Sequence, residues 1–287
     1  SWREVVQWAL PLYAARSDIG TDVRAVAAAI AARSGDKREM LVEVLRFVQN
    51  EIRYLGIEMG ARSYAPNPPE MVLRQRFGDC KDKSLLMVTL LRELGIEAYP
   101  ALVNTRYRKQ IAEWQPTPTA FNHLIVYARM DGKAYWLDPT RLYQKGTLDA
   151  LHQPDYGRAL VIDTATNDLT EMIHIHTYHE KSVDEVYDLR GATGETTAFS
   201  VETHYKRYYA DGMRESLATQ NHDEIKKNYV KFYERQFPDI RATRDFVVTD
   251  DALANQVTVA EAYAIPHLWK PDKDGGTVRF AFYPSLI

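Results

Sequence analysis

Apolar residues recur at helical spacing along the first part of the chain. Over residues 37–50 they fall every three or four positions, which is typical of one face of an amphipathic helix. The pattern predicts further helices over residues 2–15, 22–33 and 80–94. Asp79 stands before the last of these and Gly95 after it, as a helix N-cap and a C-terminal glycine would. Residues 51–79 are interrupted by prolines, so we expect them to be irregular.

The pattern changes to that of strands after the helix at 80–94. Strand-like segments follow at 97–104, 121–129 and 134–138. Asp131-Gly132 separates the last two and is a strong signal for a two-residue hairpin loop. In that hairpin Met130 would face Lys133. Continuing the same register, Ile125 would face Asp138 and His123 would face Thr140.

The second half of the chain has a different texture. Strand-like runs at 183–189, 197–206, 256–265 and 277–283 surround one polar helix expected near 213–235. We therefore expect two domains, residues 1–175 and 176–287. The predicted fold class is α+β: a helical lobe packs on an antiparallel sheet, and a β-rich accessory domain with one helix follows.

Composition narrows the classes of partner. The 287 residues are 45% hydrophobic and 26% charged, with a formal net charge of −3. No basic excess is present to neutralise a phosphate backbone, so we expect no nucleic-acid partner. No apolar run approaches the roughly 18–20 residues of a membrane span. Because the chain begins at Ser1 without a Met, we expect it to be a processed or trimmed fragment.

Three residues together suggest nucleophilic chemistry. Cys80, the single cysteine, opens the helix at 80–94, where unpaired backbone N–H groups and the helix dipole stabilise a thiolate. His123 lies on one strand of the hairpin and Asp138 ends the other. Each has a simpler reading when taken alone: a buried free cysteine, a core histidine and a turn carboxylate.

The hairpin register strengthens the functional reading. Side chains alternate along a strand, so His123, Ile125 and Asp138 share one face of the sheet. His123 and Asp138 are then diagonal neighbours, with Cβ atoms about 7–8 Å apart or less. An Asp so placed fixes the tautomer of the imidazole and stabilises its protonated form. A slip of one residue in register would place Asp138 on the opposite face.

Four blocks of sequence carry a family resemblance. They are Phe77-Gly78-Asp79-Cys80-Lys81-Asp82-Lys83-Ser84, Leu91-Arg92-Glu93-Leu94-Gly95-Ile96, Phe121-Asn122-His123 and Tyr135-Trp136-Leu137-Asp138-Pro139-Thr140. In this order they resemble the transglutaminase-like superfamily, which has a papain-like core, and most of all its bacterial multidomain members. The likeness is strong over about residues 35–145. It implies that Cys80, His123 and Asp138 form a catalytic triad.

The resemblance also implies a reaction. A Cys80 thiolate would attack an amide or acyl carbonyl of a protein or peptide substrate, and water or an amine would resolve the acyl-enzyme. This needs no metal and no cofactor. The bacterial relatives suggest a periplasmic or cell-surface location, and the single cysteine leaves a cytoplasmic one open. The acceptor, the substrate and the oligomeric state stay open.

Supporting residues are less well specified. An oxyanion hole is required, and the backbone N–H of Cys80 is one natural donor. Gln75 is a candidate for the second donor, although a solvated turn residue is the simpler reading. Asp82 would buttress the site or only cap the helix. Trp136 would shield the triad from water or only fill the core.

Two other functions fit parts of the same sequence. The fold could serve as a non-catalytic scaffold or peptide-binding module. An arylamine acetyltransferase shares the order Cys, His, Asp, but its typical Arg-Gly-Gly-x-Cys entry is absent here. The pH dependence of Cys80 alkylation would distinguish an enzyme from a binding module.

Overall fold

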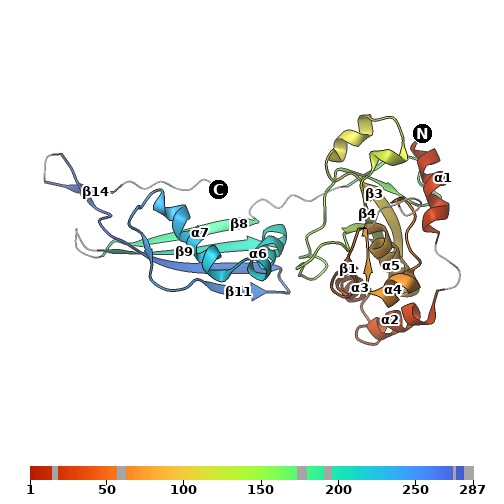
Figure 1. The fold of residues 1–287 in the computed structure, drawn as a ribbon, viewed down its shortest axis with the longest axis horizontal. Helices are drawn as coiled ribbons and strands as arrows, with labels where there is room; N and C mark the ends of the chain where they lie inside the picture. The colour runs from red at the N-terminus through yellow and green to blue at the C-terminus, as the bar shows by residue number, and fades with distance from the viewer. Residues whose placement is uncertain (15–18, 57–62, 173–179, 191–195, 274–275, 281–287) are drawn as a thin grey trace. The chain divides into compact units, whose positions relative to one another are not determined.

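The chain folds into two compact units, Ser1–His176 and Thr177–Ile287, seen here in a computed structural model (Figure 1). The structure describes all residues except 15–18, 57–62, 173–179, 191–195, 274–275 and 281–287. Each unit is built around its own sheet and its own hydrophobic clusters. The candidate site lies in the first unit.

The first unit combines helices with an antiparallel sheet. Its helices are α1 (Trp2–Tyr13), α2 (Thr21–Ala31), α3 (Lys37–Glu51), α4 (Pro69–Gln75) and α5 (Cys80–Glu93), with short 3₁₀ helices η2 (Arg108–Glu113) and η3 (Pro118–Ala120). Its main sheet has the order β5-β4-β3-β6-β7, made of β3 (Glu97–Val103), β4 (His123–Met130), β5 (Lys133–Leu137), β6 (Arg158–Val161) and β7 (Thr170–Glu171). A parallel pair, β1 (Arg53–Tyr54) and β2 (Phe77–Gly78), lies outside it. The stretch 51–79, predicted as irregular, therefore contains β1, α4 and β2.

Helix α5 is the centre of this unit. Every residue from Cys80 to Leu91 is buried, polar ones included. A helix buried on all sides needs partners on all sides. Figure 1 shows α2, α3 and α4 gathered around α5, and all of them contribute to one apolar cluster with β4 and β5. This packing fixes the position of the first turn of α5 against the sheet.

The hairpin β4–β5 has the predicted register. Met130 pairs with Lys133 and Val126 pairs with Leu137. Asp131 and Gly132 both have positive φ angles, 52° and 72°, as a type I′ turn requires. The ladder ends at Leu137. Asp138 therefore lies just beyond the paired residues, where its carboxylate is free to turn toward the beginning of β4.

The second unit is a twisted sheet covered on one face by two helices (Figure 1). Its elements are β8 (Lys181–Asp188), β9 (Thr197–Lys206), α6 (Arg207–Thr219), α7 (His222–Glu234), β10 (Arg241–Ala242), β11 (Val247–Asp251), β12 (Gln256–Ile265), β13 (Lys270–Pro271) and β14 (Val278–Arg279). The sheet order is β10-β12-β9-β8, with β11 paired to β12. The fold class, mixed helices and antiparallel sheets with a strand-rich C-terminal region, is confirmed.

The single helix expected near 213–235 is wrong. The structure has α6 and α7 there, separated at Gln220 and Asn221. Gln220 is extended, and the side chain of Asn221 accepts a hydrogen bond from the backbone N–H of Asp223. Asn221 is therefore the N-cap of a new helix, which a purely periodic reading of the apolar residues overlooked.

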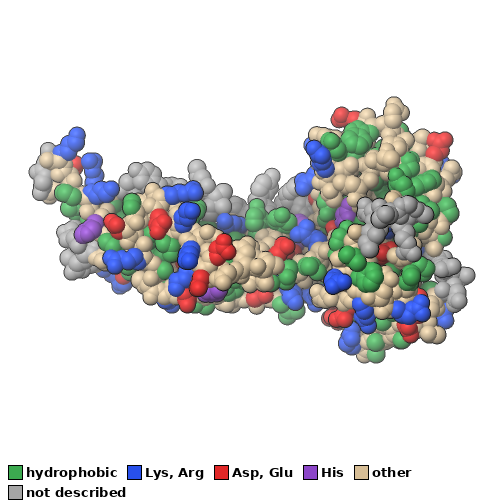
Figure 2. Space-filling model, in the orientation of Figure 1, with side chains coloured by type: hydrophobic (Ala, Val, Ile, Leu, Met, Phe, Trp, Pro, Cys, Tyr) green, Lys and Arg blue, Asp and Glu red, His purple; other side chains and the backbone are tan. Residues whose placement is uncertain are grey.

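Charges of both signs are interspersed over the face shown in Figure 2, in keeping with the small net charge. Within the part of the chain that the structure describes, no helix has both the length and the apolar character to cross a membrane.

Candidate active site

The beginning of α5 is a tightly closed turn. The Asp79 side chain accepts hydrogen bonds from the backbone N–H groups of Lys81 (2.9 Å) and Asp82 (3.2 Å). The Asp82 carboxylate in turn accepts from the backbone N–H of Asp79 at 3.2 Å, which completes a capping box. Cys80 is the first residue inside this box and is 4% exposed.

Asp79 has a second partner that neutralises it. The Lys81 ammonium lies 2.6 Å from the Asp79 carboxylate, and both side chains are 6% exposed. Burying either charge alone would be costly, whereas the pair is compensated. The charged residues that flank Cys80 therefore cancel each other close to the thiol.

Asp82 connects α5 to the segment before α4. Its two carboxylate oxygens accept the backbone N–H of Asn67 at 2.6 Å and the side-chain amide of Asn67 at 3.0 Å. Gly78 makes room for this carboxylate, because a Cβ there would lie 2.6 Å from the Asp82 Cβ. Asp82 thus ties the first turn of α5, next to Cys80, to the backbone at Asn67.

His123 and Asp138 meet at the end of the hairpin. His123 Nε2 lies 2.9 Å from Asp138 Oδ2. The other carboxylate oxygen accepts the backbone N–H of Thr140 at 2.9 Å and its hydroxyl at 2.6 Å. The Tyr156 hydroxyl donates to Oδ2 at 3.2 Å, and its ring meets the His123 ring edge to face. Asp138 is 3% exposed, and these donors compensate its buried charge.

The Cys80 thiol is a second neighbour of the imidazole, and their interaction contributes to the pKa of His123. Burial alone would lower the pKa of His123, but the interactions with Asp138 and Cys80 outweigh it and raise the pKa from 6.5 to about 10. Burial likewise favours the neutral form of Asp138, and the hydrogen bonds from His123 and Thr140 outweigh it, so the pKa of Asp138 is lowered. At neutral pH a protonated ring thus lies between an ionised carboxylate and the thiol.

A buried polar network lies behind Asp138. The Gln49 amide donates to the backbone carbonyl of Asp138 at 3.1 Å and to the Gln144 side chain at 2.9 Å. The fully buried Lys83 ammonium donates to the backbone carbonyl of Ile52. Burial lowers the pKa of Lys83 to about 8, despite the Asp138 charge nearby. This network ties α3 to α5 and to Asp138.

Sequence reasoning missed Tyr156, Gln49 and Lys83. Lys83 had a usable signal, since a lysine among apolar residues on a buried helix requires a polar partner. Tyr156 and Gln49 had none, because they are separated from Asp138 by 18 and 89 residues respectively.

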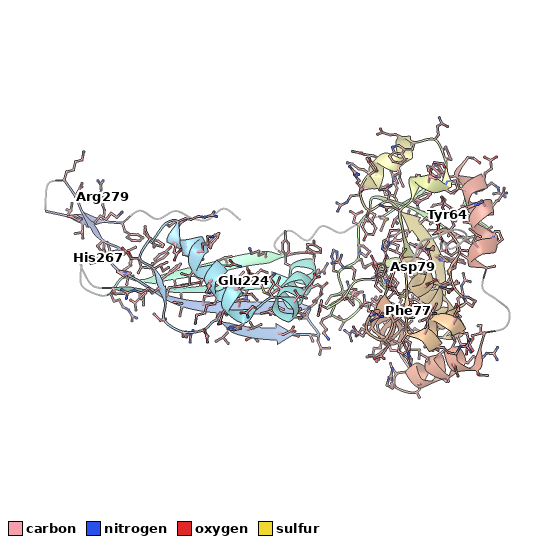
Figure 3. All side chains as sticks on the ribbon, in the orientation of Figure 1. Tyr64, Phe77, Asp79, Glu224, His267 and Arg279 are labelled. Atoms are coloured by element: carbon pink, nitrogen blue, oxygen red, sulfur yellow. The ribbon has the colours of Figure 1, made fainter. Side chains whose placement is uncertain are left out.

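A pocket of about 290 Å³ opens beside the thiol. It is lined by Trp8, Tyr13, Ser63, Tyr64, Cys80, Lys81, Leu102, Pro118, Phe121, Asn122, His123 and Leu124. Figure 3 labels Tyr64, which lies next to α1 and lines the pocket, and Asp79 at the beginning of α5. The pocket joins residues of α1, α5 and β4.

Gln75 and Trp136 are not among the residues that line this pocket. The Gln75 amide donates to the backbone carbonyl of Phe77 at 2.8 Å, so its N–H group is engaged in the turn before α5. Trp136 is buried and packs against Tyr127, with ring centroids 4.8 Å apart. It belongs to the hydrophobic cluster that also contains Ile125.

Among the described residues, no group of three or more His, Cys, Asp and Glu side chains is arranged to hold a metal ion.

Comparison with known proteins bears on the same residues. Residues 24–138 match the family model of the transglutaminase-like superfamily. A structure described as a "putative protease" from Parabacteroides distasonis is 13% identical, with a TM-score of 0.45 over 92% of this chain and 52% of that one. A "putative cysteine protease" from Cytophaga hutchinsonii is 16% identical, with a TM-score of 0.34 over 47% of this chain and 42% of that one. The chain thus spans about half the length of these proteins or less.

No curated protein matched the chain. The family match extends from α2 to the end of the hairpin and includes Cys80, His123 and Asp138. Residues 24–138 of this chain therefore belong to the transglutaminase-like superfamily.

Proposed function

We propose that the chain is a cysteine enzyme that hydrolyses or transfers acyl groups at amide bonds of a protein or peptide, with Cys80 as nucleophile, His123 as base and Asp138 as orienter. One observation carries the proposal. A single imidazole is hydrogen-bonded to a buried carboxylate at 2.9 Å, and it shares a pocket and an electrostatic interaction with the only thiol of the chain, at a helix start. This is the arrangement by which a weak nucleophile is activated.

The geometry distinguishes the two ring nitrogens. Nε2 of His123 is bonded to Asp138, so Nδ1 is the nitrogen that exchanges a proton with Cys80. Asp138 holds the ring in this orientation and stabilises its positive charge. Tyr156 and Thr140 hold Asp138 in turn, and act as positioning residues.

The reaction follows in balanced steps. The Cys80 thiolate adds to the carbonyl carbon, and the carbonyl oxygen becomes an oxyanion. The imidazolium gives its Nδ1 proton to the leaving amine as the C–N bond breaks, which leaves a thioester and a neutral ring. Water or an amine then attacks the thioester while Nδ1 accepts its proton, and the thiolate is released beside a protonated His123.

The oxyanion needs a donor that is already in place. The backbone N–H of Cys80 is in the first turn of α5, where N–H groups lack partners within the helix. The Asp79 carboxylate occupies the next two N–H groups. We assign the Cys80 N–H to the oxyanion, with the positive end of the α5 dipole behind it.

Thiol labelling tests the proposal directly. Cys80 should react with iodoacetamide near pH 7 faster than a free thiol does, because the charged ring stabilises the thiolate. His123→Ala should slow this labelling toward the free-thiol rate. Cys80→Ala should abolish peptide-amide hydrolysis and amine incorporation. Unchanged labelling in His123→Ala, or activity in Cys80→Ala, would refute the mechanism.

Asp138→Asn tests whether Asp138 orients the His123 ring or only fills space. The substitution keeps the shape but favours the wrong tautomer of His123, so the acylation rate should fall by on the order of 10⁴-fold, as in triads of this kind. Stopped-flow release of an amine from a peptide amide would measure it. If both the unchanged protein and Asp138→Asn bind peptide but form no thioester, the non-catalytic binding module would be favoured instead.

A further inference from the structure

Two aromatic rings form one wall of the pocket beside Cys80. The Trp8 and Tyr64 rings meet edge to face, with centroids 5.2 Å apart and planes 84° apart. Both line the pocket, and both are exposed, at 37% and 43%. Large exposed rings that meet at the mouth of a pocket are typical of binding sites, because they offer apolar area with little loss of conformational freedom.

Trp8 is not required for packing α1. The buried face of this helix consists of Trp2, Val5, Val6, Ala9 and Tyr13. Trp8 lies off that face and instead faces the loop that carries Tyr64. Its position is therefore better explained by the pocket than by the core.

The wall is held in place from two sides. The buried Tyr13 hydroxyl donates to the Tyr64 backbone carbonyl at 3.0 Å. Three residues further on, Asn67 is bound by the Asp82 carboxylate of α5. The segment that carries Tyr64 is thus fixed both to α1 and to the helix that presents Cys80, so the ring is positioned relative to the thiol.

The charged groups among the described residues that line the pocket already have partners. None of these residues is a carboxylate, Lys81 is paired with Asp79 at 2.6 Å, and His123 is paired with Asp138 at 2.9 Å. A charged side chain would lose its hydration without gaining an ion pair. An apolar side chain would bury its surface against Trp8, Tyr64, Phe121 and Pro118.

We infer that this pocket selects peptides with a bulky apolar side chain, above all an aromatic one, beside the scissile amide, and that Trp8 and Tyr64 determine this specificity. The inference rests on the proposed function, for which it names the substrate class. Trp8 belongs to α1, which precedes the segment that matches the superfamily.

Binding to the Cys80→Ala protein tests the inference without turnover. Blocked peptides that differ only at one central position, Phe, Leu, Gly, Asp or Lys, are titrated by calorimetry. We expect the Phe and Leu peptides to bind at least about 10-fold more tightly than the others. Adding Trp8→Ala or Tyr64→Ala should remove this preference.

Trp114→Ala is the matched control. Trp114 is also 37% exposed, and its ring centroid lies 4.9 Å from that of Tyr107. It does not line the pocket. This variant should keep the preference for Phe and Leu. Circular dichroism checks each fold, and Trp8→Phe replaces Trp8→Ala if the latter unfolds, with an intermediate preference expected.

The outcomes separate the inference from the proposed function. Equal binding of all peptides, no binding of the Phe peptide at about 1 mM, or a preference that survives in both aromatic variants overturns the inference. The active protein is then assayed with the same peptides. Selective binding without turnover refutes the proposed function and supports the selectivity of the pocket. Turnover without selective binding supports the proposed function and overturns the inference.

Discussion

His123 is the residue on which the site depends most. Its side chain is 13% exposed and has a carboxylate on one side and a thiol on the other. Burial disfavours the charged ring, yet the interactions with Asp138 and Cys80 outweigh that penalty. The raised pKa keeps the ring protonated at neutral pH, the form from which the proposed mechanism would protonate a leaving amine.

The raised pKa of His123 predicts how stability depends on pH. The pKa is about 10 in the folded protein and 6.5 in the absence of its partners. Protonation of His123 therefore stabilises the fold fully below pH 6.5, and this stabilisation is lost as the pH rises through about 10. In urea unfolding, the loss in free energy of unfolding caused by His123→Gln should shrink as the pH rises from 6.5 to about 10.

Ring NMR shifts supply a direct check of the same point. The His123 ring should stay protonated through neutral pH in the unchanged protein and lose its proton at a lower pH in Asp138→Asn. A ring that titrates near 6.5 in the unchanged protein would contradict the prediction.

At the scale of elements, the segment 78–82 caps α5, holds the segment that precedes α4 and presents Cys80. Asp79 caps the helix, Asp82 closes the capping box and holds the preceding segment, and Cys80 sits between them. Gly78 permits this, since Asp82 occupies the space that a side chain would need. The order of residues in this string thus has a local steric reason as well as a chemical one.

Gly78→Ala tests whether the Asp82 side chain requires a glycine at position 78. Its Cβ would lie 2.6 Å from the Asp82 Cβ and 3.0 Å from the carboxylate, so the Asp82 side chain must move. We expect a loss of about 1–3 kcal/mol in the free energy of unfolding and slower labelling of Cys80. Denaturant unfolding and iodoacetamide kinetics measure the two effects.

Gly35→Ala is the control for that substitution. Nothing lies within 4 Å of a Cβ at Gly35, so its effect should stay within about 0.5 kcal/mol. Equal effects of the two alanines would mean that crowding against Asp82 does not constrain Gly78.

At the scale of the whole molecule, each unit has a core of its own. Clusters around α5 stabilise the first unit, and clusters between the sheet and α6 and α7 stabilise the second. The second unit also contains a buried Arg214 that is paired with Asp211 and Asp250. Changes confined to one core should therefore act on that unit.

Gly212→Ala tests this independence. Gly212 lies inside α6, and nothing lies within 4 Å of a Cβ there. Alanine should stabilise the helix by about 0.5–1 kcal/mol. Hydrogen exchange should slow in α6 and β9 and stay unchanged in α5, with Cys80 labelling unaffected. Slower exchange in α5 as well would show that the two units are coupled.

The local parts of the site could be predicted from the sequence. Asp79 before Cys80 marks a helix start, and Asp131-Gly132 sets the register that places Asp138 near His123. These signals suffice because caps and two-residue turns act over a few residues, and because strand alternation is strict. The break at Asn221 was also a local signal, and a reading based on periodicity alone missed it.

The remainder was decided by the tertiary structure. Tyr156, Gln49 and Trp8 reach the site from elements far away in the chain, and no spacing or turn motif specifies such contacts. The amide of Gln75, which sequence position alone made an oxyanion candidate, is bonded to Phe77. Local rules thus place the reacting groups on their elements, whereas packing around the buried α5 determines which residues support them and which line the pocket, because burial depends on every element at once.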